Sequence, residues 1–94
     1  MIIQVSSLVS QSPNQPYSKL DDEGILLSVQ QGKYYAMDRV GTKVWEMIKE
    51  PISVSDLCEQ LTQVYKVEKA QCLTDILAYL NGLYRQRLII HHQN

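Results

Sequence analysis

Few residues of this 94-residue chain are of types that carry out chemistry. Cys58 and Cys72 lie far apart in the sequence, and each falls within a predicted helix. A metal site needs more ligands at shorter spacing, so we interpret both as small core residues. His91 and His92 are adjacent near the end of the chain, which favours a frayed tail over a ligand pair. No nucleophile–base pair is visible, so we expect no catalysis, no cofactor and no metal.

The stretch from residue 32 to residue 45 offers a different chemistry, that of main-chain hydrogen bonding. Tyr34 and Tyr35 follow a glycine turn and are good strand formers, so Lys33–Met37 is predicted to be an edge strand. An edge strand presents unpaired N–H and C=O groups, to which an extended peptide can add. Successive side chains point to opposite faces, which places Tyr34 with Ala36 and Tyr35 with Met37. One tyrosine is therefore expected to pack inward and the other to be free.

A helix predicted over residues 69–87 would flank this strand. Its core stripe is Leu73, Ile76, Leu77, Leu80, Leu83 and Tyr84. A second stripe beside it is Asp75, Ala78, Tyr79 and Gly82. Glycine inside a helix costs about 1 kcal/mol relative to alanine, and close approach of another backbone is one reason to keep it. A helix irregularity or a contact within the same chain explains Gly82 equally well.

The elements that position these residues can be traced in order. A hairpin is predicted from residues 25–29 and 33–37, with a turn at residues 30–32. Its third strand could come from residues 2–5, 8–9 or 17–20, and the sequence leaves this open. Residues 10–16 are polar with two prolines, which indicates a loop or a mobile link. Residues 88–90 could form a short final strand.

Three helices follow the hairpin. Asp38 is predicted to cap the first, over residues 38–49, which Pro51 ends. Ser53 and Asp56 match a capping box at the start of the second. We expect one core formed by Trp45, Leu57, Leu61, Ile76, Leu77 and Leu80.

This inventory predicts an α+β fold, a winged helix-turn-helix domain with a three-stranded antiparallel sheet followed by three helices. Residues 17–90 would form the domain, residues 1–16 an N-terminal segment with one short strand or a mobile link, and residues 91–94 a tail. The net charge is −1, from 9 basic and 10 acidic residues, and the third helix carries its basic residues at its ends. DNA binders cluster such residues, so nucleic acid is not expected. Signal peptide and membrane span are both missing from the sequence, so we expect a cytoplasmic protein without membrane contact.

An ordered set of short motifs runs through the hairpin and the first helix. These are Ile25-Leu26-Leu27, Gly32-Lys33-Tyr34-Tyr35, Asp38-Arg39-Val40-Gly41 and Val44-Trp45. In this order they resemble the PqqD-like family, whose pattern is a Leu-Leu strand, Gly-x-Tyr-Tyr, Leu-Asn-x-x-Gly and Ile-Trp. The resemblance covers roughly residues 20–90. Met37 and Asp38 stand where that family usually has leucine and asparagine, and aspartate caps a helix as asparagine does.

The resemblance implies a RiPP recognition element, a small module that binds the leader of a ribosomally made precursor peptide and presents it to a separate enzyme. Residues 45–54 look most similar to the stand-alone subunits of lasso-peptide pathways, where the partner is a cysteine leader peptidase. The alternative within the family is a chaperone for a radical-SAM peptide-modifying enzyme. From another class, a winged-helix DNA-binding regulator remains open, as does a small dimerisation domain. We expect a monomer or a weak dimer.

The leader would add along the predicted edge strand, in a cleft against the third helix. Pockets between them would accept apolar side chains of the leader. The predicted peptide-binding residues are Lys33, Tyr34, Tyr35, Ala36, Met37, Asp75, Ile76, Ala78, Tyr79, Leu80, Gly82 and Leu83.

Overall fold

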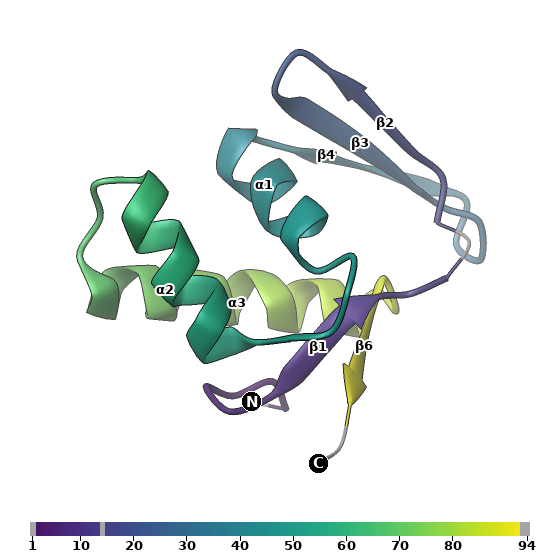
Figure 1. The fold of residues 1–94 in the computed structure, drawn as a ribbon. Coiled ribbons are helices and arrows are strands. Elements are labelled where there is room, and N and C mark those ends of the chain that lie inside the picture. The colour runs from purple at the N-terminus through teal and green to yellow at the C-terminus, as the bar shows by residue number, and fades with distance from the viewer. Residues whose placement is uncertain (1, 14, 93–94) are drawn as a thin grey trace.

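The computed structural model describes residues 2–13 and 15–92. Four strands precede the first helix, and α3 is the longest element (Figure 1). The elements are β1 (Leu8–Gln11), β2 (Tyr17–Leu20), β3 (Glu23–Ser28), β4 (Lys33–Met37), α1 (Arg39–Met47), β5 (Ile52–Ser53), α2 (Val54–Val64), α3 (Lys69–Arg85) and β6 (Ile89–His92). The predicted α+β class is confirmed.

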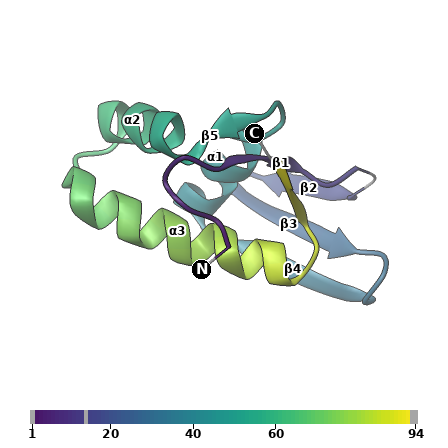
Figure 2. The same cartoon turned by 90° about the horizontal axis from the view of Figure 1, so that it is seen from below.

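The strands form two antiparallel sheets, where a single sheet was predicted. One sheet has the order β2-β3-β4, and the other has the order β5-β1-β6. Residues 17–20 therefore supply the outer strand of the hairpin sheet, which the sequence had left open. Figure 2 shows α2 and α3 side by side, with β6 leading back from the end of α3 to β1.

The hairpin sheet leads directly into α1. Gly32 has a φ of +64°, a conformation that glycine adopts without strain, and it closes the β3–β4 turn. Asp38 then caps α1 as predicted, its carboxylate accepting a hydrogen bond of 2.7 Å from the N–H of Gly41. The capping side chain of Ser53 accepts from the N–H of Asp56 in the same way at α2. Local caps thus fix where both helices begin.

The C-terminal end of α3 is closed by two main-chain hydrogen bonds. The N–H of Leu88 donates to the carbonyl of Leu83, and that of Arg87 donates to Tyr84. This is the Schellman arrangement, in which the residue after the cap takes a left-handed conformation. Arg87 does so with a φ of 61°. The helix therefore ends at Arg85, two residues before the predicted boundary.

The N-terminal segment packs into the molecule. Asn81 on α3 holds it, because its side chain accepts from the N–H of Ile3 at 3.0 Å and donates to the carbonyl of Ile3 at 3.2 Å. The predicted tail begins later than expected, since His91 and His92 belong to β6, which pairs with β1. Residues 93–94 lie outside the described part of the chain.

One hydrophobic core joins both sheets to the helices. Trp45, Leu57, Leu61, Ile76 and Leu80 are all buried in it as predicted. Leu77 is only half-buried and packs against its surface. Ile3 and Val9 from the N-terminal segment are fully buried in the same core. Within the described residues, none of the helices has the length and apolar character needed to cross a bilayer.

Candidate functional site

β4 is one of the two outer strands of the hairpin sheet. One hydrogen bond shows which of its main-chain groups point away from the sheet. The N–H of Leu27 on β3 donates to the carbonyl of the residue preceding β2, so the main chain of Leu27 points to β2. Successive residues of a strand direct these groups to opposite sides, so Leu26 points to β4 and to its partner Tyr35. Tyr34 and Ala36 therefore direct their N–H and C=O groups away from β3, toward the free edge.

The side chains of β4 alternate between two environments, as predicted. Tyr34 is 73% exposed, and Ala36 beside it on the same face is also exposed. Tyr35 is half-buried and Met37 is buried, so both face the helices. The strand thus contributes main-chain groups at its edge and apolar side chains beneath it.

A hollow of about 510 Å³ opens where the end of β4 meets α3. Five of the predicted binding residues line it, namely Ala36, Met37, Asp75, Ile76 and Tyr79. Nine further lining residues were missed by the sequence analysis: Asp38, Val40, Gly41, Val44, Leu61, Tyr65, Val67, Gln71 and Cys72. The last six are brought together only by the packing of α1, α2 and α3, whereas Asp38, Val40 and Gly41 belong to a motif that the sequence did show.

Tyr79 forms one wall of this hollow. Its hydroxyl donates a hydrogen bond of 3.2 Å to the carbonyl of Gly41 in the first turn of α1. Burial, together with the nearby Asp38 carboxylate, raises the pKa of Tyr79 to about 12. A Cβ at Gly41 would lie 3.1 Å from both the Tyr79 hydroxyl and an Asp38 oxygen, so a side chain there would push one of these groups back by a few tenths of an ångström.

A second connection joins β4 to α3 at the opposite end of the strand. The hydroxyl of Tyr35 lies 2.7 Å from Oε1 of Gln86 and 3.0 Å from Oε1 of Gln31. Gln86 is the C-cap residue of α3, and Gln31 lies in the β3–β4 turn. The strand and the helix therefore run antiparallel, because Met37 shares the hollow with Tyr79 and Tyr35 contacts Gln86.

The remaining predicted binding residues on α3 fall into two groups. Leu80 is fully buried and Leu83 is 7% exposed, so in this structure both are packing residues of the core. Ala78 is exposed, and a Cβ built at Gly82 would meet nothing within 4 Å. A close contact within the chain therefore does not explain Gly82. The surface of α3 at Gly82, between Tyr79 and Gln86, therefore has open space next to it.

The two cysteines are core residues, as predicted. Cys58 on α2 and Cys72 on α3 are both buried free thiols. Burial raises the pKa of the Cys58 thiol to about 11, and the neighbouring Cys72 adds to this. A thiol with such a pKa stays protonated at neutral pH, so it lacks the thiolate needed for nucleophilic chemistry.

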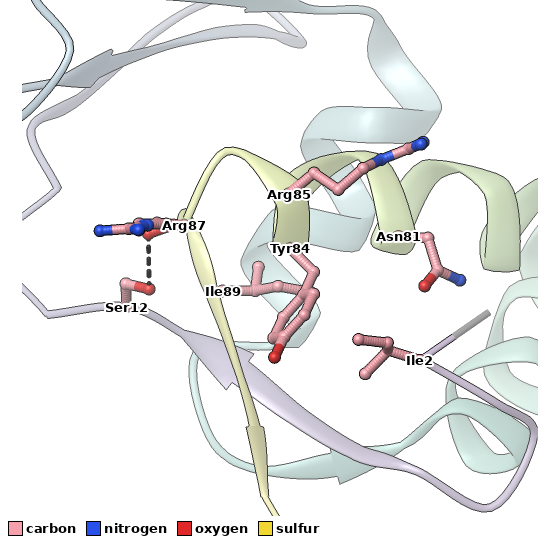
Figure 3. Close-up of a pocket in the computed structure, with 7 residues that line it drawn as sticks. All are labelled: Ile2, Ser12, Asn81, Tyr84, Arg85, Arg87 and Ile89. Atoms are coloured by element: carbon pink, nitrogen blue, oxygen red, sulfur yellow. Dashed lines mark hydrogen bonds between the residues drawn. The ribbon is translucent and has the colours of Figure 1, made fainter.

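A second hollow, of about 570 Å³, lies on another side of α3 (Figure 3). Ile2, Tyr84 and Ile89 contribute its apolar surface, and Asn81 lines it while holding the N-terminal segment. None of the residues that line it belongs to β4. The hollow beside β4 is the better candidate, because unpaired main-chain groups and apolar surface occur there together.

Two solved structures are similar to this chain over most of its length. The first is TbiB1 in complex with the TbiA(beta) leader peptide, at 24% identity and a TM-score of 0.81, covering 90% of this chain and 99% of that one. The second is the PqqD truncation of Methylobacterium extorquens PqqCD, described as a functional and stand-alone RiPP recognition element. It is 20% identical with a TM-score of 0.78, covering 94% of each chain. These likenesses show a shared fold. A search of curated protein sequences found no match.

The family model for coenzyme PQQ synthesis protein D (PqqD) matches residues 23–89. The match runs from the first residue of β3 to the first residue of β6, and so includes β4, α1 and α3. It contains the free edge, the hollow beside it and the capped start of α1. On this match over more than half of its length, the chain belongs to the PqqD family.

Proposed function

We propose that this protein binds the leader region of a ribosomally made precursor peptide as an added strand on β4. The observation that carries this proposal is the free edge at Tyr34 and Ala36, which lies next to an apolar hollow. Support also comes from the similar fold of TbiB1, which was solved with a leader peptide. In strand addition, main-chain hydrogen bonds give affinity and pockets for alternate side chains give specificity.

The bound peptide would use two kinds of contact. Tyr34 and Ala36 each offer one N–H and one C=O to the incoming strand, which gives it a fixed register. Every second side chain of the peptide would then face α3, where Met37, Ile76 and Tyr79 line the hollow. Tyr79 is positioned to limit the size of the side chain that enters, since its hydroxyl is tied to α1.

The role of the protein is delivery, without chemistry of its own. A leader held on β4 keeps the rest of the precursor at high effective concentration near a partner enzyme. The partner that the sequence favours is a cysteine leader peptidase of the lasso-peptide type. The partner should process a leader-bearing peptide faster in the presence of this protein at low peptide concentration. If the protein instead accelerates a radical-SAM peptide-modifying enzyme, its role is that of a chaperone for that enzyme.

An amide chemical-shift titration tests the binding site. The probes are the synthetic TbiA(beta) leader peptide and the leader of the precursor encoded nearest to this protein's gene. Shifts should concentrate on β4 and on the face of α3 between Asp75 and Gln86. Shifts confined to β1 or α2 would contradict the proposed placement. The absence of shifts with both leaders would contradict the proposed function.

A proline substitution separates strand addition from side-chain binding. Ala36→Pro removes an N–H that points to the free edge, so it should abolish leader binding while the ladder to β3 stays intact. Ala36→Val keeps the N–H and is the control at the same position. Lys19→Pro makes the matching change on the opposite free edge, on β2, and should leave binding unchanged. Equal loss of binding in the two proline variants would contradict strand addition on β4.

A further inference from the structure

The hairpin sheet has a second face, which points away from the helices. Figure 1 shows all three helices on the same side of this sheet. On that inner side, Leu26 is fully buried and Met37 is 6% exposed. The strand pairing places a different set of residues on the outward face, because directly paired residues lie on the same face. This set is Ser18, Leu20, Glu23, Ile25, Leu27, Tyr34 and Ala36.

The outward face is largely apolar. Glu23 is the one charged residue of the set. Leu20, Tyr34 and Ile25 are 79%, 73% and 47% exposed. An antiparallel sheet with one solvated face usually carries polar residues on that face. The outward face therefore departs from the usual pattern, and its apolar surface is open to a ligand.

Tyr34 is the large side chain of the outward face that lies on β4. The main-chain groups of Tyr34 and Ala36 point to the free edge, so an added strand would lie beside them at about 4.8 Å. Every second side chain of that strand would then lie on the outward face, about 5 Å from its neighbour on β4. Ala36 offers little surface there, whereas the ring of Tyr34 is mostly exposed. The peptide residue beside Tyr34 on this face therefore meets an aromatic ring.

The rest of the outward face lies farther from an added strand. Ile25 and Leu27 are on β3, one strand spacing beyond β4. Leu20 is on β2, so it lies about 14 Å from the added strand, at three strand spacings. Leu20 therefore shares the face with Tyr34 but is out of reach of the peptide.

We infer that Tyr34 determines specificity at the leader site, by selecting a large apolar side chain at the outward-facing position beside it. The inference rests on the proposed function and names the class of peptide that the site takes. The peptide residues before and after that position face the other way, toward the hollow lined by Met37 and Ile76. The recognised segment is therefore apolar on both faces, and its sequence is a run of apolar residues without polar residues in alternation.

The pairing of Tyr34 with Leu27 offers a simpler explanation for part of this arrangement. A cross-strand contact between an aromatic ring and an aliphatic side chain stabilises a hairpin. Tyr34 stays 73% exposed beside the half-buried Leu27, so most of the ring surface is left uncovered. The main chain of Tyr34 also points to the free edge, which stabilisation of the hairpin does not require. The exposed ring is therefore assigned to the peptide.

The test is a selection from a displayed library of random peptides on the intact protein. Peptides enriched by the unaltered protein should share a run of consecutive apolar residues. Selection on Tyr34→Glu should change one position of that run to Lys or Arg, since a carboxylate replaces the ring, and the positions on either side should stay apolar. Leu20→Glu adds the same charge to the same face out of reach of the peptide, and it should enrich the original run.

The affinities of individual peptides provide a second readout. Lys at the outward-facing position should weaken binding to the unaltered protein about fivefold, which corresponds to about 1 kcal/mol, the upper range for a cross-strand pair. The same Lys peptide should bind Tyr34→Glu more tightly than it binds the unaltered protein in low salt, where the exposed charges are least screened. Thermal unfolding checks that Tyr34→Glu is folded. If it is not, Tyr34→Thr keeps a strand former without the ring and should lose the preference at that one position.

Two results would overturn this inference and leave the proposed function in place. One is a set of enriched peptides that shift the amides of Tyr34 and Ala36 but keep the same preference on Tyr34→Glu. The other is an unchanged preference in both Glu variants together with a lower molar mass in light scattering or a lost acceleration of the partner enzyme. That result would assign the outward face to a second copy of the chain or to the enzyme. A selection without peptides that bind at β4 would overturn both the inference and the proposed function.

Discussion

The hydroxyl of Tyr79 donates a hydrogen bond of 3.2 Å to the carbonyl oxygen of Gly41, which joins the middle of α3 to the first turn of α1. The N–H of the same Gly41 donates to the capping carboxylate of Asp38. One glycine therefore connects the end of β4, the start of α1 and α3. Gly41 and Tyr79 both line the hollow beside β4, so this hydrogen bond forms part of its wall.

Tyr79→Phe should lower the free energy of unfolding by about 1 kcal/mol, because it removes one partly buried hydrogen bond. Urea unfolding measures the change, with Tyr34→Phe as the control, since the side chain of Tyr34 is largely exposed. Equal stability of Tyr79→Phe and the unaltered protein would show that the bond contributes nothing.

The raised pKa of Tyr79, about 12, predicts a loss of stability at high pH. The unfolded chain releases this proton near pH 10, earlier than the folded protein, so folding favours the protonated form. The stability that Tyr79 contributes is complete below about pH 10 and declines as the pH rises toward about 12. The decline should be smaller in Tyr79→Phe when urea unfolding of both proteins is compared at pH 8 and pH 11.

Two glycine-to-alanine changes should act in opposite directions. Gly82→Ala adds a methyl group into open space and replaces a poor helix former, so it should raise stability by about 0.5–1 kcal/mol. Gly24→Ala places its Cβ 2.6 Å from a ring carbon of Tyr17 and 2.9 Å from the methyl of Met37, so it should lower stability by about 1–3 kcal/mol. Thermal unfolding of both variants checks the pair.

A large side chain at Gly82 should block leader binding without unfolding the protein. Gly82→Phe fills the space beside α3 that the peptide is proposed to occupy, and the added ring does not enter the core. Isothermal titration with the leader measures binding, and the melting temperature checks the fold. Gly82→Ala is the control and should bind normally. Undiminished binding by a folded Gly82→Phe protein would place the peptide elsewhere.

Asn81→Ala should be among the more damaging substitutions on α3. It leaves the N–H and the C=O of buried Ile3 without their partner, which should cost about 2–3 kcal/mol. Asn81→Asp can still accept from the N–H of Ile3 but cannot donate to its carbonyl, so it should also be destabilised. Amide hydrogen exchange should show faster exchange at Ile3 in both variants, with smaller changes in α2.

Local patterns in the sequence determined the helix caps and the strand that surround the site. Asp38 and Ser53 cap α1 and α2 because each side chain needs only a residue three positions ahead. The glycine turn and the alternation of Tyr34 and Tyr35 predicted β4 and the faces of its side chains, since a strand has a period of two. The motifs along this stretch also indicated the family.

Tertiary structure decided what depends on residues far apart in the chain. The pairing of Leu8 with His92 created a second sheet and made a strand of the expected tail. The sequences of β1 and β6 do not show that these two strands pair with each other, because sheet register is set by packing across the whole molecule. The burial of Leu80 and the contact between Tyr35 and Gln86 follow from where α3 lies relative to the other elements. A helical period identifies an apolar face but cannot say which neighbouring element covers it.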